Sequence, residues 1–378
     1  MGQDGRPAEP AGTAEGGGAR HAGLTRLRFF LIGWVILYHL DLPLHVTETY
    51  TWLAPVLRRG YLGVDGFFLL SGFALWLGYR ARPPMGRAGI GQFLLRRVAK
   101  IWPLHALALL ALALLVGVAV ALGVTIRDPD RFGLRDFLLQ LALLNAWETT
   151  ESFTWNYPSW ALSVEWAGYL AFPFVLRGLL RLPSAAVALV ATGGLLGLWL
   201  LTRWGPTPSL NHTLHLGLLR FGLEFGIGLS LGRLATEGRL PRALLWPALA
   251  GLPAGLLLGQ DALAALGLAA LVPTIWLASL GRPAPARPDL LLRLGEASFG
   301  IYLCWVFVEA AVVGALRLVD PGPPGRAALM VAGYLATLLA GWLAWRWVEM
   351  PAQRWILRRR AAPSPLGLAR AATERSGA

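Results

Sequence analysis

Residues 28–39 read Arg28-Phe-Phe-Leu-Ile-Gly-Trp-Val-Ile-Leu-Tyr-His39, an apolar run with a cation at its start and an imidazole at its end. In a helix, at about 1.5 Å per residue, His39 lies roughly 16 Å beyond Arg28. That distance is near the middle of a bilayer whose apolar core is about 30 Å thick. An ionisable group at that depth indicates a functional site, because it needs a polar cavity or a partner. The alternative is a neutral histidine that hydrogen-bonds between packed helices.

The whole chain has the composition of a membrane protein. Of its 378 residues 56% are hydrophobic, and the mean hydropathy is +0.54. The net charge of +13 is distributed over the breaks between apolar runs, whereas a nucleic-acid-binding protein gathers its cations on one face. The single cysteine, Cys304, excludes an intramolecular disulfide and a cysteine-based metal site. The composition therefore predicts an all-α polytopic membrane protein, with no bound metal or cofactor and no nucleic-acid partner.

Ten crossings are predicted, near residues 27–43, 60–79, 98–123, 158–176, 184–202, 214–232, 243–259, 262–280, 297–316 and 327–347. With a cytoplasmic N-terminus, 25 of the 34 lysine and arginine residues fall in inner segments and 8 in outer ones. This asymmetry obeys the positive-inside rule, so both termini are predicted to be cytoplasmic. Residues 137–147 are apolar but too short to cross, and we expect a re-entrant or interfacial helix on the outer side.

Two tails flank the predicted membrane domain, which spans residues 26–357. Residues 1–25 are rich in Gly and Ala and lack a long apolar run, which predicts a disordered cytoplasmic tail. Residues 358–378 are basic and are predicted to form a second disordered cytoplasmic tail. The polar region before the first apolar run is too long for a signal peptide, so that run is expected to be a retained helix.

Ionisable and hydroxyl side chains from four predicted spans fall in one layer, between the outer surface and the middle of the membrane. They are His39, Asp65, Ser71, Ser163, Glu165, Arg220 and Glu224. Isolated structural hydrogen bonds would scatter with depth, so the layer favours a shared functional cavity. We expect His39 and Glu165 to be the catalytic pair, because a nearby carboxylate fixes the tautomer of an imidazole and favours its protonated form.

The supporting residues also have structural interpretations. Arg220 and Glu224, four residues apart, could form a buried pair that only holds helices together. Asp65 could cap the N-terminus of its helix. Ser71 and Gly72 could be small residues that let two helices approach closely.

A second basic site is predicted on the inner face. Arg96-Arg-Val-Ala-Lys100-Ile-Trp-Pro103 opens the third span, with Arg97 and Lys100 on one helix face, and Arg28 opens the first span. These cations are well placed to bind the phosphates of a cytoplasmic donor. Ordinary positive-inside anchoring is the alternative.

Five motifs occur in the order of a known family. They are Arg28 with His39, Gly63-Val-Asp-Gly-Phe-Phe-Leu-Leu-Ser-Gly-Phe73, the Arg96–Pro103 segment, Trp155-Asn-Tyr-Pro-Ser-Trp-Ala-Leu-Ser-Val-Glu165 and Glu349-Met-Pro351. Together they resemble the integral-membrane acyltransferase family 3, bacterial O-acyltransferases that act on sugars, surface polysaccharides and some antibiotics. The resemblance covers residues 24–357.

The resemblance implies ten membrane helices in the bacterial inner membrane and an acyl-CoA donor, with acetyl-CoA expected, bound from the cytoplasm. It also implies that His39 is essential and that Arg28, Ser163 and Glu165 are important. The chain departs from the family in two places. Lys100 replaces the second arginine of a usual Arg-x-x-Arg, which loses bidentate phosphate geometry, and Tyr302-Leu-Cys-Trp305 lacks the histidine of a common Tyr-Leu-x-His.

The predicted function is transfer of a short acyl group from cytoplasmic acyl-CoA to a hydroxyl of a carbohydrate or of a glycosylated or secondary metabolite. In this interpretation Arg28, Arg97 and Lys100 bind the donor, and His39 is the general base, with a covalent acyl-histidine the less favoured route. The acceptor or supporting cluster comprises Asp65, Ser71, Ser163, Arg220 and Glu224. The alternative is a secondary transporter or exporter of a small polar metabolite, since its midplane site also needs buried ionisable groups.

Overall fold

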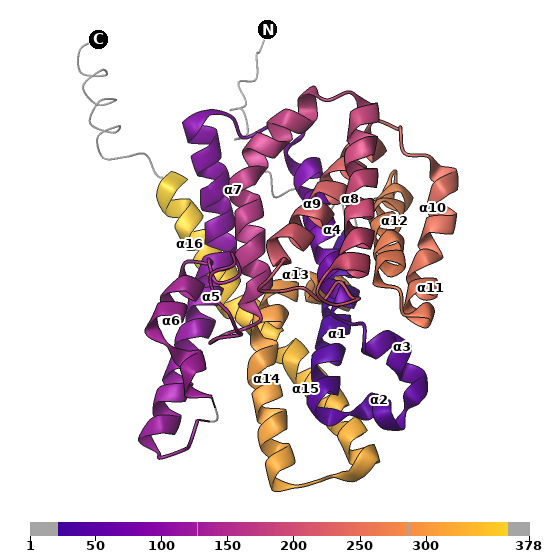
Figure 1. Ribbon diagram of the computed structural model, residues 1–378. Helices are drawn as coiled ribbons and strands as arrows, with labels where there is room; N and C mark the ends of the chain where they lie inside the picture. Colours follow the sequence, from indigo (N-terminus) through magenta and orange to yellow (C-terminus); the bar gives the residue numbers. More distant parts are fainter. Residues whose placement is uncertain (1–21, 127, 284, 286, 362–378) are drawn as a thin grey trace, which may run out of the picture. The chain divides into compact units, whose positions relative to one another are not determined.

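The computed structural model describes residues 22–126, 128–283, 285 and 287–361, and it contains helices but no strand over that part of the chain (Figure 1). Its first helix, α1, begins at Ala22, and its last, α16, ends at Ala361. The predicted tails, 1–25 and 358–378, therefore fall largely outside the described residues. The all-helical fold class is confirmed for the described part.

The described chain divides into two compact units. Unit 1 comprises the described residues up to Arg82, with Leu176–Asn211 and Leu219–Glu296, and unit 2 comprises Pro83–Val175, His212–Leu218 and the described residues from Ala297. Unit 1 holds α1 (Ala22–Leu44), α2 (Val46–Thr49), α3 (Ala54–Leu57), α4 (Leu62–Tyr79), α8 (Ser184–Trp204), most of α9 (Gly217–Thr236), α10 (Arg242–Leu249), α11 (Gly251–Leu258), α12 (Asp261–Ser279) and α13 (Leu290–Glu296). Unit 2 holds α5 (Gly86–Ala121), α6 (Leu134–Leu141), most of α7 (Ser159–Arg181), α14 (Ser298–Leu318), α15 (Gly322–Ala344), a π-helical turn (Trp345–Glu349) and α16 (Met350–Ala361).

Every predicted crossing coincides with a helix or a pair of helices. Seven helical stretches of the described residues are long and apolar enough to cross a membrane: Ala22–Leu44, Thr51–Tyr79, Gly86–Ala121, Ser184–Trp204, Asp261–Ser279, Ser298–Leu318 and Gly322–Arg359. The other three predicted crossings correspond to α7, to α9 and to the pair α10 and α11. The total of ten crossings stays a prediction.

Two helix boundaries differ from the sequence prediction. The third predicted crossing was placed at 98–123, yet α5 already begins at Gly86, so Arg97 and Lys100 lie inside a continuous helix rather than at its start. Arginine, glutamine and alanine propagate a helix well, so hydropathy marks a membrane boundary and not a helix end. The predicted 137–147 helix is instead α6, Leu134–Leu141, after which the chain turns.

The short helix α6 exposes two leucines and buries a polar side chain. Its Leu134 and Leu138 are exposed, whereas Gln140 is only 1% exposed. The side-chain amide of Gln140 donates to the carbonyl of Thr154 at 2.7 Å, and its Oε1 accepts from the N–H of Asn156 at 3.0 Å. Arg135 is also exposed on α6, and the interfacial or re-entrant placement of this helix stays a prediction.

Glycines let α4 and α9 of unit 1 pack backbone against backbone. A Cβ on Gly72 would lie 2.2 Å from the carbonyl oxygen of Phe225, and one on Gly228 would lie 2.1 Å from that of Leu69. Real side chains do not tolerate such distances, so only glycine allows this approach. The small-residue interpretation of the Ser71-Gly72 pair is therefore confirmed for Gly72.

Helix α4 also packs closely against α1. A Cβ on Gly63 would lie 2.7 Å from the carbonyl oxygen of Leu31, and helix α12 contacts both α1 and α4. The first turns of α4 are thus enclosed in unit 1. This enclosure fixes the direction in which Asp65 points.

Candidate active site

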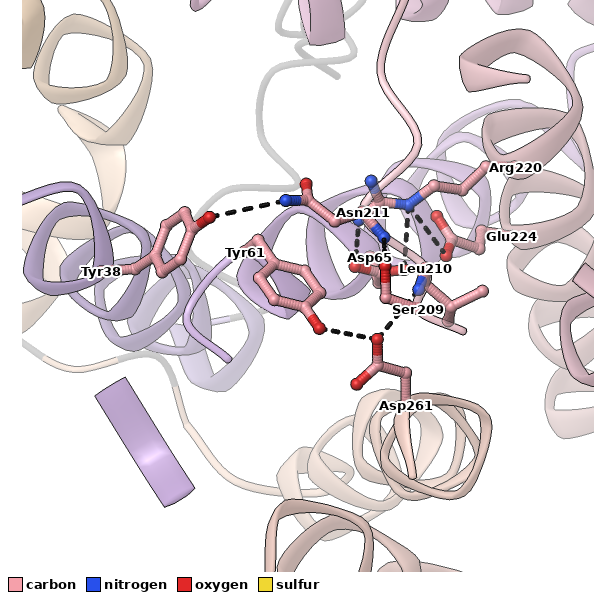
Figure 2. Close-up of polar contacts among 9 residues, drawn as sticks. All are labelled: Tyr38, Tyr61, Asp65, Ser209, Leu210, Asn211, Arg220, Glu224 and Asp261. Atoms are coloured by element: carbon pink, nitrogen blue, oxygen red, sulfur yellow. Dashed lines mark hydrogen bonds and ion pairs between the residues drawn. The ribbon is translucent and has the colours of Figure 1, made fainter. Parts of the chain in front are cut away.

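A buried charge cluster joins α4 and α9 in unit 1. The Arg220 guanidinium donates from Nε to Oδ1 of Asp65 at 3.1 Å and from Nη2 to Oδ2 of the same carboxylate (Figure 2). Arg220 Nε also lies 3.9 Å from Oε1 of Glu224, one helical turn along α9. All three side chains are 0% exposed. Two carboxylates therefore share one guanidinium, and its planar fork engages Asp65 at two points.

The buried pair of Arg220 and Glu224 that the sequence allowed is present, and the structure adds Asp65 as the closer partner. Asp65 was also a candidate helix cap, yet its two oxygens face the guanidinium of another helix. Ser71 lies further along α4, beside the glycine that packs on α9.

A second polar cluster in unit 1 was missed by sequence reasoning, and it centres on Asp261, the first residue of α12. Oδ2 of Asp261 accepts from the Tyr61 hydroxyl at 2.7 Å and from the backbone N–H of Leu210 at 2.9 Å (Figure 2). Its Oδ1 accepts from Nε of Arg59 at 3.3 Å. The only sequence signal was an acidic residue at the edge of an apolar run, which does not reveal its partners.

His39 lies on α1 beside the ring of Tyr38. Its ring contacts that of Tyr38 edge-on, with 4.9 Å between centroids, and the Tyr38 ring contacts that of Tyr61 at 5.5 Å. Arg28 lies eleven residues earlier on the same helix and is half-buried, so the predicted spacing of about 16 Å along one helix is retained.

Glu165 lies on α7 in unit 2. The Tyr169 hydroxyl donates to its Oε1 at 2.7 Å. His39 belongs to unit 1, so the pairing of His39 with Glu165 stays a prediction.

Ser163 holds the loop after α6. Its Oγ donates to the carbonyl of Leu143 at 2.9 Å and accepts from the N–H of Ala146 at 3.1 Å, while its own carbonyl accepts from Trp147 Nε1 at 2.9 Å. The side chain is buried. In the Ser-x-Glu motif, Ser163 therefore has a structural role, because its hydrogen bonds fix the loop. Glu165 is the residue of the motif whose carboxyl group can take part in acid–base chemistry.

The two cations of the predicted donor site have different surroundings in unit 2. The guanidinium carbon of Arg97 lies 5.7 Å from the ring centroids of both Phe93 and Tyr169, and none of the carboxylates in the described residues pairs with it. Lys100 instead lies 3.3 Å from Oε1 of Glu349, which is 1% exposed. Arg97 thus presents a half-buried charge that rings orient, whereas the charge of Lys100 is already balanced.

Glu349 is the second buried acidic residue whose partner the sequence left open. The Glu349-Met-Pro351 motif was visible, but nothing local indicated Lys100 as its partner. Glu349 closes a π-helical turn, Trp345–Glu349, and turns of this kind often occur at functional sites.

We predict that protonation of His215 depends on Glu148. His215 lies before α9, which begins at Gly217 rather than at the predicted 214, and its Nδ1 is 2.8 Å from Oε2 of Glu148. This hydrogen bond raises the pKa of His215, and Glu151 at 3.9 Å acts in the same direction. The imidazolium contact stabilises the loop at pH values below about 6.5 and is lost as pH rises through the raised pKa.

The measurement is NMR titration of ¹³C-labelled histidine in the detergent-solubilised protein, with the His215 signal assigned from a His215→Gln variant. The Glu148→Gln variant should lower the titration midpoint of His215. An unchanged midpoint would show that Glu148 does not control this group.

Comparison with known proteins agrees with the motif order. Residues 21–346 match the family model described as an acyltransferase domain. Acyltransferase MdmB of Streptomyces mycarofaciens is 28% identical over 390 aligned positions, which cover 90% of this chain and 95% of that protein. Exopolysaccharide production protein ExoZ of Rhizobium meliloti (strain 1021) is 29% identical over 331 positions, which cover 83% and 95%. None of the solved structures matches the chain significantly.

The family match spans most of the chain, including α1 with His39, the charge cluster of α4 and α9, and Arg97 on α5. It confirms the family that the five motifs indicate. The chain therefore belongs to the membrane acyltransferases of acyltransferase family 3, enzymes that transfer groups other than amino-acyl groups.

Proposed function

We propose that this enzyme moves a short acyl group from cytoplasmic acyl-CoA, with acetyl-CoA the expected donor, to a hydroxyl of a carbohydrate or of a glycosylated or secondary metabolite. In the proposed topology it crosses the bacterial inner membrane ten times, with both termini in the cytoplasm. ExoZ, the relative described as an exopolysaccharide production protein, is consistent with a carbohydrate acceptor.

The observation that carries the proposal is the environment of Arg97. A half-buried guanidinium that lies against two aromatic rings and pairs with none of the described carboxylates is suited to bind an anion such as a CoA phosphate. Lys100 lies on the same helix face, where Glu349 already balances its charge, and Arg28 is the third cation of the proposed donor site.

The direction of the helices in unit 1 supports the topology. Asp65 pairs with Arg220 near the starts of α4 and α9, and the Trp76 indole donates to Thr236 near their ends at 2.9 Å. The two helices therefore run parallel. The proposed topology has both of them enter the membrane from the outer side.

In the proposed reaction the acceptor oxygen attacks the thioester carbonyl while the imidazole of His39 takes the hydroxyl proton. The carbon–sulfur bond then breaks, and the departing CoA thiolate takes that proton from the imidazolium. Glu165, which accepts a hydrogen bond from Tyr169, orients and stabilises the imidazolium in this scheme. A site within the protein also shields the thioester from water.

Two measurements test the proposal. Mass spectrometry of cell-surface glycans and secreted metabolites, with and without this protein, should show a mass difference equal to one acyl group on one acceptor. Purified protein should release free thiol from acetyl-CoA when the identified acceptor is added. A secondary transporter would move the metabolite without releasing thiol, and that result would overturn the proposal.

We predict that Arg97→Ala raises the KM for acetyl-CoA and leaves protein abundance nearly unchanged. Loss of one contact to a charged phosphate should cost about 1.5–3 kcal/mol of donor binding. Arg87→Ala, an exposed arginine earlier on α5, is the matched control and should leave this KM unchanged. A shift in the KM for the acceptor instead would remove Arg97 from the donor site.

A further inference from the structure

The Asp261 cluster holds a loop of unit 1 in place. The N–H of Leu210 donates to Asp261 at 2.9 Å, and the next N–H, of Asn211, donates to Oγ of Ser209 at 3.3 Å. Consecutive backbone amides are thus both fixed. Asp261 is only 3% exposed, so the carboxylate anchors the loop from the interior.

Two routes of contact lead from Asp261 to the residue that precedes His39. Along the first, Asp261 accepts from the Tyr61 hydroxyl, and the Tyr61 ring lies against the Tyr38 ring at 5.5 Å. Along the second, the anchored loop places Nδ2 of Asn211 3.4 Å from the Tyr38 hydroxyl (Figure 2). Tyr38 in turn contacts the ring of His39.

The hydrogen bond from Asn211 to Tyr38 leaves the Asn211 amide oxygen available as an acceptor and the Tyr38 O–H available as a donor. Figure 2 shows the amide oxygen of Asn211 pointing away from Tyr38, and this exposed side chain accepts no hydrogen bond from the described residues. Because the Tyr38 hydroxyl accepts from Asn211, its own proton is free to be donated. Two neighbouring hydroxyls of a polyhydroxyl compound can satisfy both groups, one by accepting from Tyr38 and the other by donating to Asn211.

The balanced charge of the Asp261 cluster also indicates the net charge of the ligand that this site would bind. Arg59 is paired with Asp261 at 3.3 Å, so the cluster offers no unbalanced cation to a phosphate or carboxylate. Its remaining groups are tyrosine rings, hydroxyls and an amide. This combination suits an uncharged polyhydroxyl compound.

We propose that Tyr38 and Asn211 recognise two neighbouring hydroxyls of a neutral polyhydroxyl substrate beside His39, and that Asp261 is the positioning residue of this site. The inference rests on the proposed function for its chemistry, and it adds the place and the charge class of the acceptor.

Hydrogen–deuterium exchange of the full-length protein in detergent tests the site without requiring turnover. Maltotriose, at the tens of millimolar expected for a weak sugar probe, should slow exchange in the peptide that contains residues 205–211, and glucose 6-phosphate should not. Asp261→Asn should speed exchange at Leu210 and abolish the maltotriose effect, while Arg203→Gln, a change at an exposed residue before the loop, should keep it. Absence of protection by maltotriose, or equal protection by the phosphorylated sugar, would overturn the inference.

The second experiment measures steady-state kinetics with acetyl-CoA and maltotriose as the two substrates. Asn211→Ala and Tyr38→Phe should raise the KM for maltotriose about two- to tenfold each, with little change in kcat or in the KM for acetyl-CoA. A change in kcat alone would overturn the recognition role. Protection in the exchange experiment without thiol release from any acceptor would instead contradict the proposed acyl transfer and leave the binding site standing.

Discussion

Replacement of His39 by alanine or asparagine is expected to lower turnover by about 10²–10⁴-fold, the usual loss when a general base is removed. Asparagine retains a hydrogen-bonding group of similar reach but cannot take a proton from the acceptor hydroxyl. Both variants should insert and purify as monodisperse protein, because the packing of α1 depends on its apolar residues and on the glycines of α4.

The matched control is His45→Asn. His45 follows α1, is exposed, and has a left-handed backbone with φ of 52°, a conformation that asparagine adopts readily. This control should retain near-normal turnover. If His39 only packed between helices, His39→Asn would keep most of its activity, since interhelical hydrogen bonds in membranes average only about 0.6 kcal/mol. A folded His39→Asn enzyme with normal turnover would remove the catalytic assignment.

Replacement of Arg220 by methionine should lower the free energy of unfolding by about 3–5 kcal/mol, the range for breaking a buried ion pair. The substitution leaves Asp65 and Glu224 buried beside each other with no cation between them. Thermal unfolding of the detergent-solubilised variant would report the loss. The exposed pair of Arg326 with Asp320 supplies the control, because Arg326→Gln should cost no more than about 1 kcal/mol.

A triple variant separates structure from function at this cluster. Arg220→Met combined with Asp65→Asn and Glu224→Gln removes every charge and should recover most of the lost stability. If activity returns with stability, the cluster only holds α4 against α9. If the stable triple variant stays inactive, the charges serve the reaction. Stability that fails to recover would show that the cost lies in packing and not in unpaired charge.

Local properties of the chain predicted a large part of this molecule. Apolar length located helices at every predicted crossing, since backbone groups in lipid must be satisfied within the segment. Motif order identified the family over most of the chain, and depth along the spans grouped Asp65 with Arg220 and Glu224, which the structure brings together.

The pairings of those side chains were decided by the tertiary structure alone. Lys100 pairs with Glu349, which lies 249 positions away in the sequence, and Arg59 pairs with Asp261, which lies 202 positions away. Such contacts depend on the rotation and register of packed helices, and a hydropathy pattern carries neither. The same limit explains why the sequence indicated Glu224, a neighbour of Arg220 on one helix, but could not indicate Asp65 as the closer partner.

The sequence by itself determined that this protein is helical, that it has the composition of a membrane protein, and that it is an acyltransferase, because apolar length and motif order are properties of the chain. Only the tertiary structure decided which cations keep an available charge. Arg97 keeps an available charge because its neighbours are aromatic rings. Lys100 does not, because the fold places the buried carboxylate of Glu349 beside it.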